Sequence, residues 1–163
     1  MKPFKRKILF TAFLLGAASI AQANPYLIKY KGLTLGEIDN LTTLKDLYLD
    51  AKATNPIVRL LLGKSHYVFY AGKKPEISHA KFRRDKNQLL FALREAITHR
   101  PKYKRFDITK DKKLVVACKK DVCNYQYIKK GIVNDSGIIL FDEDNQFYKL
   151  TEKKSNVVIV KKK

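Results

Sequence analysis

The close spacing of β-type runs in the second half of the chain restricts its fold more than any other sequence feature. From Tyr103 onward, stretches rich in aromatic and β-branched residues follow one another with only a few residues between them. A parallel crossover needs a dozen residues or more, so neighbouring strands here must pair antiparallel. The strongest turn signal is Asn134-Asp135-Ser136-Gly137. The predicted strands are 103–108, 113–118, 122–130, 132–134, 137–142, 146–151 and 156–161.

The two cysteines of the chain, Cys118 and Cys123, fall within this region. The residues between them allow a hairpin in which the cysteines face each other and Val116 faces Tyr125. This register groups apolar and aromatic side chains, and it predicts a structural disulfide. A redox-active pair is the alternative, but the usual two-residue spacing is missing and no helix is predicted to follow that would lower a thiol pKa.

The first half of the chain reads as strand, helix, strand and helix. A strand is predicted at 26–31, and Thr34 with Glu37 forms a capping box that opens an amphipathic helix ending before Asn55. Its apolar face is Leu41, Leu44, Tyr48 and Ala51. The apolar run 57–62 is compatible with a buried helical turn or with a strand.

The second helix has the clearest pattern in the sequence. It follows a predicted strand at 65–71 and a basic loop at 72–84, with Asp85 as its cap and Pro101 as its stop. Leu89, Leu90, Leu93, Ala96 and Ile97 share one face, and Phe91 falls on the opposite face. The predicted fold is therefore a single α+β domain over 24–163, with two helices in the N-terminal half packed on a C-terminal antiparallel β-meander.

Residues 1–23 have the pattern of a cleavable signal peptide. Four basic residues precede an apolar run from Ile8 to Ala18, and the small-residue site at 21–23 follows. This run is about half the length of 20 residues that a stable membrane span needs, so no span is expected in the mature chain. The pattern predicts a periplasmic or secreted protein that begins near Asn24.

The charge of the chain is strongly positive and uneven. The formal net charge is +19, and removal of the leader, with four basic and no acidic residues, leaves +15. Residues 64–113 carry +10, against +1 for 24–63 and +4 for 114–163. Such a bias indicates an anionic partner: an anionic envelope component, an acidic glycan, nucleic acid or an acidic protein. The alternative is a general lysine bias, because the chain has 27 lysines and 7 arginines.

The candidate polyanion site consists of basic residues in this middle third, some interleaved with aromatics. The run 102–106 also fits an ordinary strand in which Phe106 and Ile108 face the core and the lysines face solvent. The candidate binding residues are Lys73, Lys74, Lys81, Arg83, Arg84, Arg100, Lys102, Lys104 and Arg105.

The sequence contains little that indicates catalysis. The spacing of His66, His79 and His99 places no two of them on one helical face, so neither a metal site nor a cofactor is predicted. His79 and Lys81 followed by Asp85 partly match the His-x-Lys…Asp pattern of phospholipase D-type phosphodiesterases, but those enzymes leave four residues between Lys and Asp and this chain leaves three.

Three functions follow from these observations. The first is an exported, non-catalytic binding or envelope-accessory protein that engages an anionic partner. The second is a small secreted hydrolase, phosphodiesterase-like, that uses His79 and His66. The third is a subunit of an envelope or secretion assembly, which would expose an apolar patch.

Overall fold

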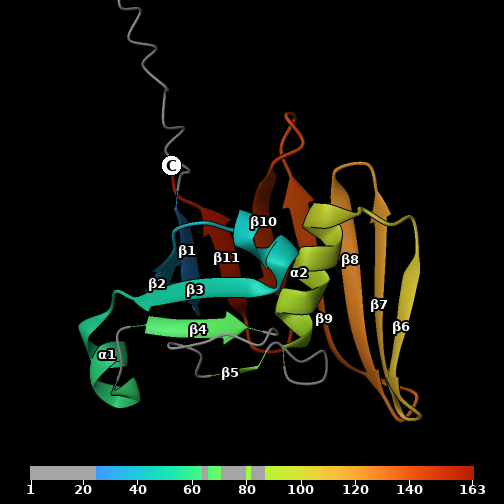
Figure 1. Cartoon of the computed structure of the whole chain (residues 1–163), viewed down its shortest axis with the longest axis horizontal. Coiled ribbons are helices and arrows are strands. Elements are labelled where there is room, and N and C mark those ends of the chain that lie inside the picture. Colours follow the sequence, from blue (N-terminus) through green and yellow to red (C-terminus); the bar gives the residue numbers. More distant parts are fainter. Residues whose placement is uncertain (1–24, 64–65, 71–79, 82–86) are drawn as a thin grey trace, which may run out of the picture.

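The computed structural model describes residues 25–63, 66–70, 80–81 and 87–163 (Figure 1). In these ranges eleven strands form one sheet, in the order β5-β4-β3-β2-β1-β11-β10-β9-β8-β7-β6. Neighbouring strands pair antiparallel, except that β4 and β5 are parallel. The first five strands are β1 (Tyr26–Tyr30), β2 (Leu33–Ile38), β3 (Tyr48–Ala53), β4 (His66–Tyr70) and β5 (Ala80–Lys81). The others are β6 (Lys104–Thr109), β7 (Lys112–Lys119), β8 (Val122–Lys129), β9 (Ile132–Phe141), β10 (Phe147–Glu152) and β11 (Val157–Lys161).

Two meanders make up this sheet, and the two ends of the described chain join them. Strand β1 pairs with β11, with Tyr26 opposite Lys161 and Tyr30 opposite Val157. The helix α2 (Gln88–Thr98) connects the meanders and lies against one face of the sheet (Figure 1). The core forms between this helix and the inward side chains of the strands, among them Leu114, Ile139 and Leu150.

The predicted fold class is wrong in the N-terminal half. The segment predicted as a helix from Thr34 to Asn55 forms β2, the short 3-10 helix η1 (Thr42–Asp46) and β3 instead. Alternation decides this: Leu49, Ala51 and Ala53 are buried at every second position of β3. Leu41 and Leu44 are buried as well. The three- and four-residue spacing of these apolar side chains therefore reflects tertiary packing, and not one face of a helix.

Long-range pairing holds these two strands in the sheet. Strand β2 lies between β1 and β3, and β3 lies between β2 and β4. A side chain at Gly36 would collide with the backbone carbonyl of Lys52, so the closeness of β2 and β3 needs glycine there. The helices of the described chain are consequently α2 and the short α1, not two helices packed on a meander.

Residues 57–62, for which the sequence allows a helical turn or a strand, belong to the short helix α1 (Pro56–Leu62). The Asn55 side chain accepts hydrogen bonds from the backbone N–H of Ile57 (2.9 Å) and Val58 (3.4 Å), and proline occupies the first turn. The segment is helical but not buried, because Ile57, Leu60 and Leu61 are 67%, 83% and 77% exposed. No helix in the described ranges has the length and apolar character required to cross a bilayer.

The second half confirms the predicted antiparallel strands and the cysteine pair. Cys118 lies opposite Cys123 with Cα atoms 3.9 Å apart, and the two form a disulfide. Val116 lies opposite Tyr125 and Leu114 opposite Tyr127, in the predicted register.

The predicted turn at residues 134–137 is wrong, because β9 runs through it as one strand. The register between β8 and β9 shifts at Tyr127 and Ile128, which accommodates an extra residue as a bulge. Asp135 is 4% exposed because it lies on the same buried face of β9 as Ile139 and Phe141. The spacing of α2 predicts Phe91 on its opposite face, but Phe91 is buried and its ring packs edge-on against Phe106 of β6.

Candidate functional site

Four of the nine predicted polyanion-binding residues lie outside the described residues: Lys73, Lys74, Arg83 and Arg84. His79 and Asp85 of the phosphodiesterase-like pattern also lie outside them. Lys81 belongs to β5, and His66 begins β4, where its backbone lies opposite Lys52. The remaining candidates, Arg100, Lys102, Lys104 and Arg105, lie between the end of α2 and the start of β6.

Arg100 has a structural role. Its Nη1 donates to Asn145 Oδ1 and its Nη2 to the Asn145 carbonyl, each at 2.7 Å. The guanidinium also lies 3.7 Å from the centre of the Phe141 ring. This geometry uses one face and both terminal nitrogens of the Arg100 guanidinium, which ties the end of α2 to the loop between β9 and β10.

Lys104 and Arg105 are also engaged within the chain. Lys104 Nζ lies 3.1 Å from Oε2 of Glu95, a carboxylate that is 2% exposed and also contacts Arg94 and His99. Arg105 pairs with the exposed Asp107 at 2.8 Å. Of the four described candidates, Lys102 is exposed and carries its charge into solvent. Three of the four described candidates are therefore engaged by Asn145, Glu95 or Asp107, and the predicted polyanion site stays a prediction.

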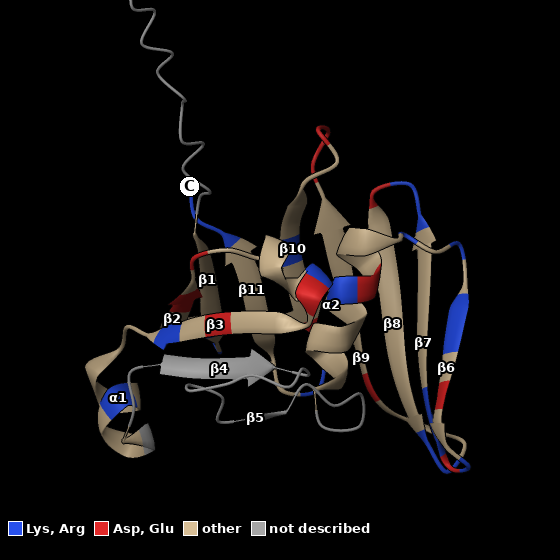
Figure 2. Ribbon diagram, in the orientation of Figure 1, with Lys and Arg blue, Asp and Glu red and all other residues tan. Residues whose placement is uncertain are grey.

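A different basic cluster forms where two hairpins end side by side. We call it the lysine tip: Lys110, Lys112, Lys129 and Lys130, from the β6–β7 and β8–β9 connections. The Lys130 backbone N–H donates to the Asp111 carbonyl at 2.7 Å, which holds the two turns together. Lys112 lies directly opposite Lys129 across β7 and β8. Two like charges in this position destabilise a sheet. The cluster is seen at the lower end of β6 to β9 in Figure 2.

The topology places further lysines toward the same end of the sheet. In a meander every second turn lies at the same end, so the β1–β2 and β10–β11 turns point the same way as the lysine tip. They contribute Lys31, Lys153 and Lys154. The opposite end carries Asp121 and the acidic loop 142–144, which are red at the upper ends of the strands in Figure 2.

The turn conformation at Lys130 is unusual for lysine. Its φ is 51°, and Gly131 follows with φ 78°. Lys31 and Gly32 repeat this arrangement, with φ values of 47° and 83°. Asparagine and glycine adopt such left-handed positions more readily than a long side chain does. Both turns therefore carry a charge at a position where local conformation favours a neutral residue.

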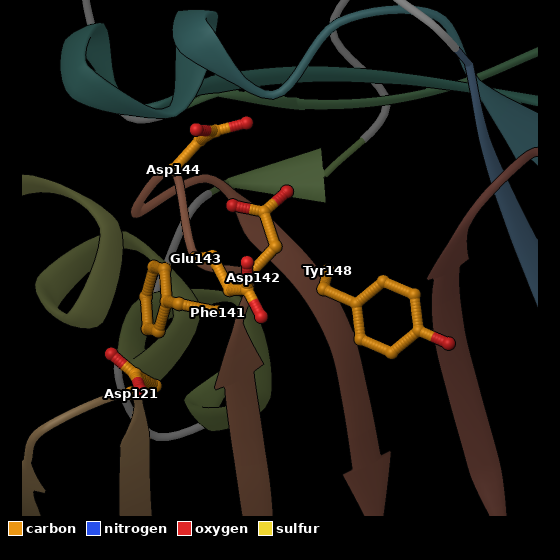
Figure 3. Close-up of a pocket in the computed structure, with 6 residues that line it drawn as sticks. All are labelled: Asp121, Phe141, Asp142, Glu143, Asp144 and Tyr148. Atoms are coloured by element: carbon orange, nitrogen blue, oxygen red, sulfur yellow. The ribbon is translucent and has the colours of Figure 1, made fainter.

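An open hollow of about 490 Å³ lies at the opposite end of the sheet (Figure 3). Its lining is acidic and aromatic: Asp121, Phe141, Asp142, Glu143, Asp144 and Tyr148. The Asp142 carboxylate already accepts a hydrogen bond from the Gln146 backbone at 2.7 Å. Across the described part of the chain, no three His, Cys, Asp or Glu residues are grouped to hold a metal ion. The hollow is an acidic surface without ligand geometry.

A pair of buried carboxyl groups lies beneath the N-terminal end of α2. Asp135 on β9 and Glu152 on β10 are 4% and 9% exposed, and their side chains share a hydrogen bond. Burial, followed by this bond to Asp135, raises the pKa of Glu152 to about 7. Gln88 Nε2 donates to Asp135 Oδ2 at 3.5 Å. Burial, and then the charges of both carboxyls, raise the pKa of the Tyr125 phenol.

A comparison with protein-family models, curated proteins and solved structures finds no match to this chain. The functional assignment consequently depends on the sites described above. The sequence contained a signal for the lysine tip, because Lys110-Asp111 and Lys130-Gly131 are two-residue turn sequences at the ends of paired strands. It contained no such signal for the buried carboxyls, since Asp135 falls in a turn-like tetrapeptide.

Proposed function

We propose that this chain is an exported, non-catalytic binding or envelope-accessory protein that engages an anionic partner through the lysine tip. The observation that carries the proposal is the clustering of Lys110, Lys129 and Lys130, three exposed lysines in two adjacent turns that a backbone hydrogen bond joins. A polyanion bound there neutralises several positive charges at once, and the attraction weakens as salt rises.

The leader and the disulfide support a location outside the cytoplasm, because disulfides persist in oxidising compartments. There the partner is an anionic envelope component or an acidic glycan, with nucleic acid and acidic proteins as the other classes that the same charges attract. Mass spectrometry of the purified exported protein tests this location. We expect an N-terminus near Asn24, and an intact Met1 in the membrane fraction would contradict it.

The binding test compares two matched pairs of substitutions, with heparin as the probe. Lys129→Gln with Lys130→Asn removes two charges from the lysine tip. Lys119→Gln with Lys120→Asn removes two charges from the β7–β8 turn at the opposite end of the sheet. The match is close, since Lys120 and Lys130 both have positive φ, 53° and 51°, and asparagine suits both positions.

We expect the tip variant to weaken heparin binding severalfold and to reduce the slope of log affinity against log salt by about 2, one for each lost contact. The opposite-end variant should leave both quantities near those of the wild type. Equal losses in the two variants would show that total charge alone matters, which is the lysine-bias alternative. Unchanged binding in both would contradict the proposed function.

The hydrolase alternative has less support. Its candidate His66 lies in β4 and His79 lies outside the described residues. Among the described residues, no three His, Cys, Asp or Glu side chains are grouped to hold a metal ion for such a reaction.

The assembly-subunit alternative is favoured by one observation, the exposed apolar side chains of Ile57, Leu60 and Leu61 on α1. A subunit would cover such side chains against its neighbour. Sedimentation of the tagged protein from envelope extract tests this alternative. A defined larger complex that Leu60→Gln and Leu61→Gln dissolve would support it, and a monomer in the extract would contradict it.

A further inference from the structure

The orphaned polar atoms of the described chain gather in one place. Four buried side-chain atoms lack a hydrogen-bond partner among the described residues: Gln88 Oε1, Tyr125 Oη, Asp135 Oδ1 and Ser155 Oγ. Buried polar groups in native proteins are almost always satisfied, so each such atom requires an explanation. All four are oxygens, and the residues that carry them belong to the surroundings of the Asp135 and Glu152 carboxyls.

The strand register and one hydrogen bond place these side chains near the two carboxyls. Gln88 donates its amide N–H to Asp135 Oδ2, which leaves its own oxygen without a partner. Glu152 lies opposite Gly137 across β9 and β10, and Gly137 is two residues from Asp135 on the same buried face of β9, while Ser155 follows Glu152 in the β10–β11 turn. Burial raises the pKa of the Tyr125 phenol, and the negative charges of both carboxyls act on this phenol and raise its pKa further. Its ring occupies the space above Gly137, the residue opposite it on β9.

The chemistry of this set is that of a hard cation site. Oxygen ligands from carboxylates, amides and hydroxyls suit calcium and magnesium, whereas zinc and copper prefer nitrogen or sulfur. Two carboxylates balance the charge of one divalent ion. The unpartnered atoms include a carboxylate and an amide oxygen, which can only accept, so a neutral donor or a cation must face them.

We propose that Asp135 and Glu152 are the charged ligands of a buried divalent-cation site of the calcium type, completed by the side-chain oxygens of Gln88 and Tyr125. This site does not depend on the lysine tip and goes beyond the proposed function. A neighbouring cation among the described residues is Lys154, which donates to Asn134 Oδ1 at 3.3 Å and whose charge acts on Glu152. Lys154→Gln should therefore tighten cation binding.

Terbium luminescence tests the site, because Tb³⁺ binds oxygen sites like those of calcium and is excited by energy transfer from a nearby aromatic ring. The chain has nine tyrosines and no tryptophan, so tyrosine is the sensitiser. We expect emission that saturates at one ion per chain and is displaced by Ca²⁺. Tyr125→Phe should abolish the emission and keep a Ca²⁺-induced rise in thermal midpoint.

The acidic hollow provides matched controls. Tyr148→Phe and Asp144→Asn alter a tyrosine and a carboxylate there, and they should leave emission unchanged. Asp135→Asn should weaken Tb³⁺ binding at least about tenfold, and Glu152→Gln provides a second variant if the first fails to fold. Emission lost in the hollow variants but kept in Tyr125→Phe would place the ion in the hollow and overturn the proposal. Absence of both emission and thermal shift would overturn it in favour of a buried water and a shared proton.

Discussion

Replacement of Glu152 by glutamine should make the protein more stable at neutral and alkaline pH. Glu152 is 9% exposed and bonded to Asp135, so ionising both carboxyls places two negative charges in the core. Without a bound cation, the protonated Glu152 carboxyl instead donates a hydrogen bond to the Asp135 carboxylate. The glutamine amide can donate in the same way at every pH, so the substitution makes this favourable arrangement permanent.

The magnitude follows from the pKa of Glu152, which rises from an ordinary value of 4.5 to about 7 on folding. The folded state holds more protons than the unfolded state between these two values, so stability falls as pH rises through this window. The full contribution is present below 4.5 and is lost above about 7. At about 1.4 kcal/mol for each pKa unit, the loss in the free energy of unfolding is about 3 kcal/mol.

Urea unfolding from about pH 5 to about pH 8, with a chelator present, measures this loss. We expect wild-type stability to fall over this range by about 3 kcal/mol more than that of Glu152→Gln, with the two proteins similar near pH 5. Glu143→Gln, an exposed change in the acidic loop, should follow the wild type. Parallel curves for the wild type and Glu152→Gln, or a less stable variant at pH 8, would refute the shared proton.

Two further substitutions test the packing of the second meander by the same unfolding assay. Gly137→Ala should lower the free energy of unfolding by about 2–4 kcal/mol, because a side chain there collides with the Tyr125 ring and approaches the Thr151 carbonyl to 2.6 Å; a neutral effect would contradict the packing of Tyr125. Replacing both Cys118 and Cys123 by alanine should cost about 2 kcal/mol through the entropy of a short closed loop. Adding reductant to the wild type should reproduce that loss, and stability insensitive to reductant would argue against the bridge.

Local information was sufficient to predict the second meander, except that it divided β9 by a turn at residues 134–137. Strands from β6 onward are separated by short turns, and the cysteine spacing fixed the register of β7 and β8. Each of these features depends on residues close together in the sequence. The helix α2 was predicted for the same reason, since its apolar spacing extends over three turns and Pro101 follows its end.

The first meander depends on contacts that a local pattern does not contain. Leu41 and Leu44 are buried because η1 packs against α2, whereas Leu49 and Ala51 are buried because β3 lies within the sheet. Read together, these four positions imitate a helical face. The pairing of β1 with β11, about 130 residues apart in the chain, completes the sheet that makes strands of both segments.

The buried carboxyl pair was unpredictable for a related reason. The sequence around Asp135 favours a turn, but β9 continues through it, so Asp135 shares the buried face of Gly137, Ile139 and Phe141. Its partner Glu152 lies on the next strand, and the Gln88 side chain reaches Asp135 from a helix 47 residues away. Such a site exists only once three elements have packed, so no spacing rule along the chain describes it.

The distribution of charge along the sequence differs from its distribution over the described sheet, and the reason is topological. Successive turns of a meander alternate between its two ends, so Lys110 and Lys130 meet at one end while Lys120, midway between them in sequence, lies at the other. The described basic residues of the middle third therefore divide between both ends, and Lys110 and Lys112 combine with Lys129 and Lys130 of the last third into one cluster. For this reason the informative comparison is between turns at opposite ends rather than between segments. The pair Lys129 and Lys130 against the pair Lys119 and Lys120 keeps charge, residue type and backbone conformation constant, and it changes only the position at which the charge is lost.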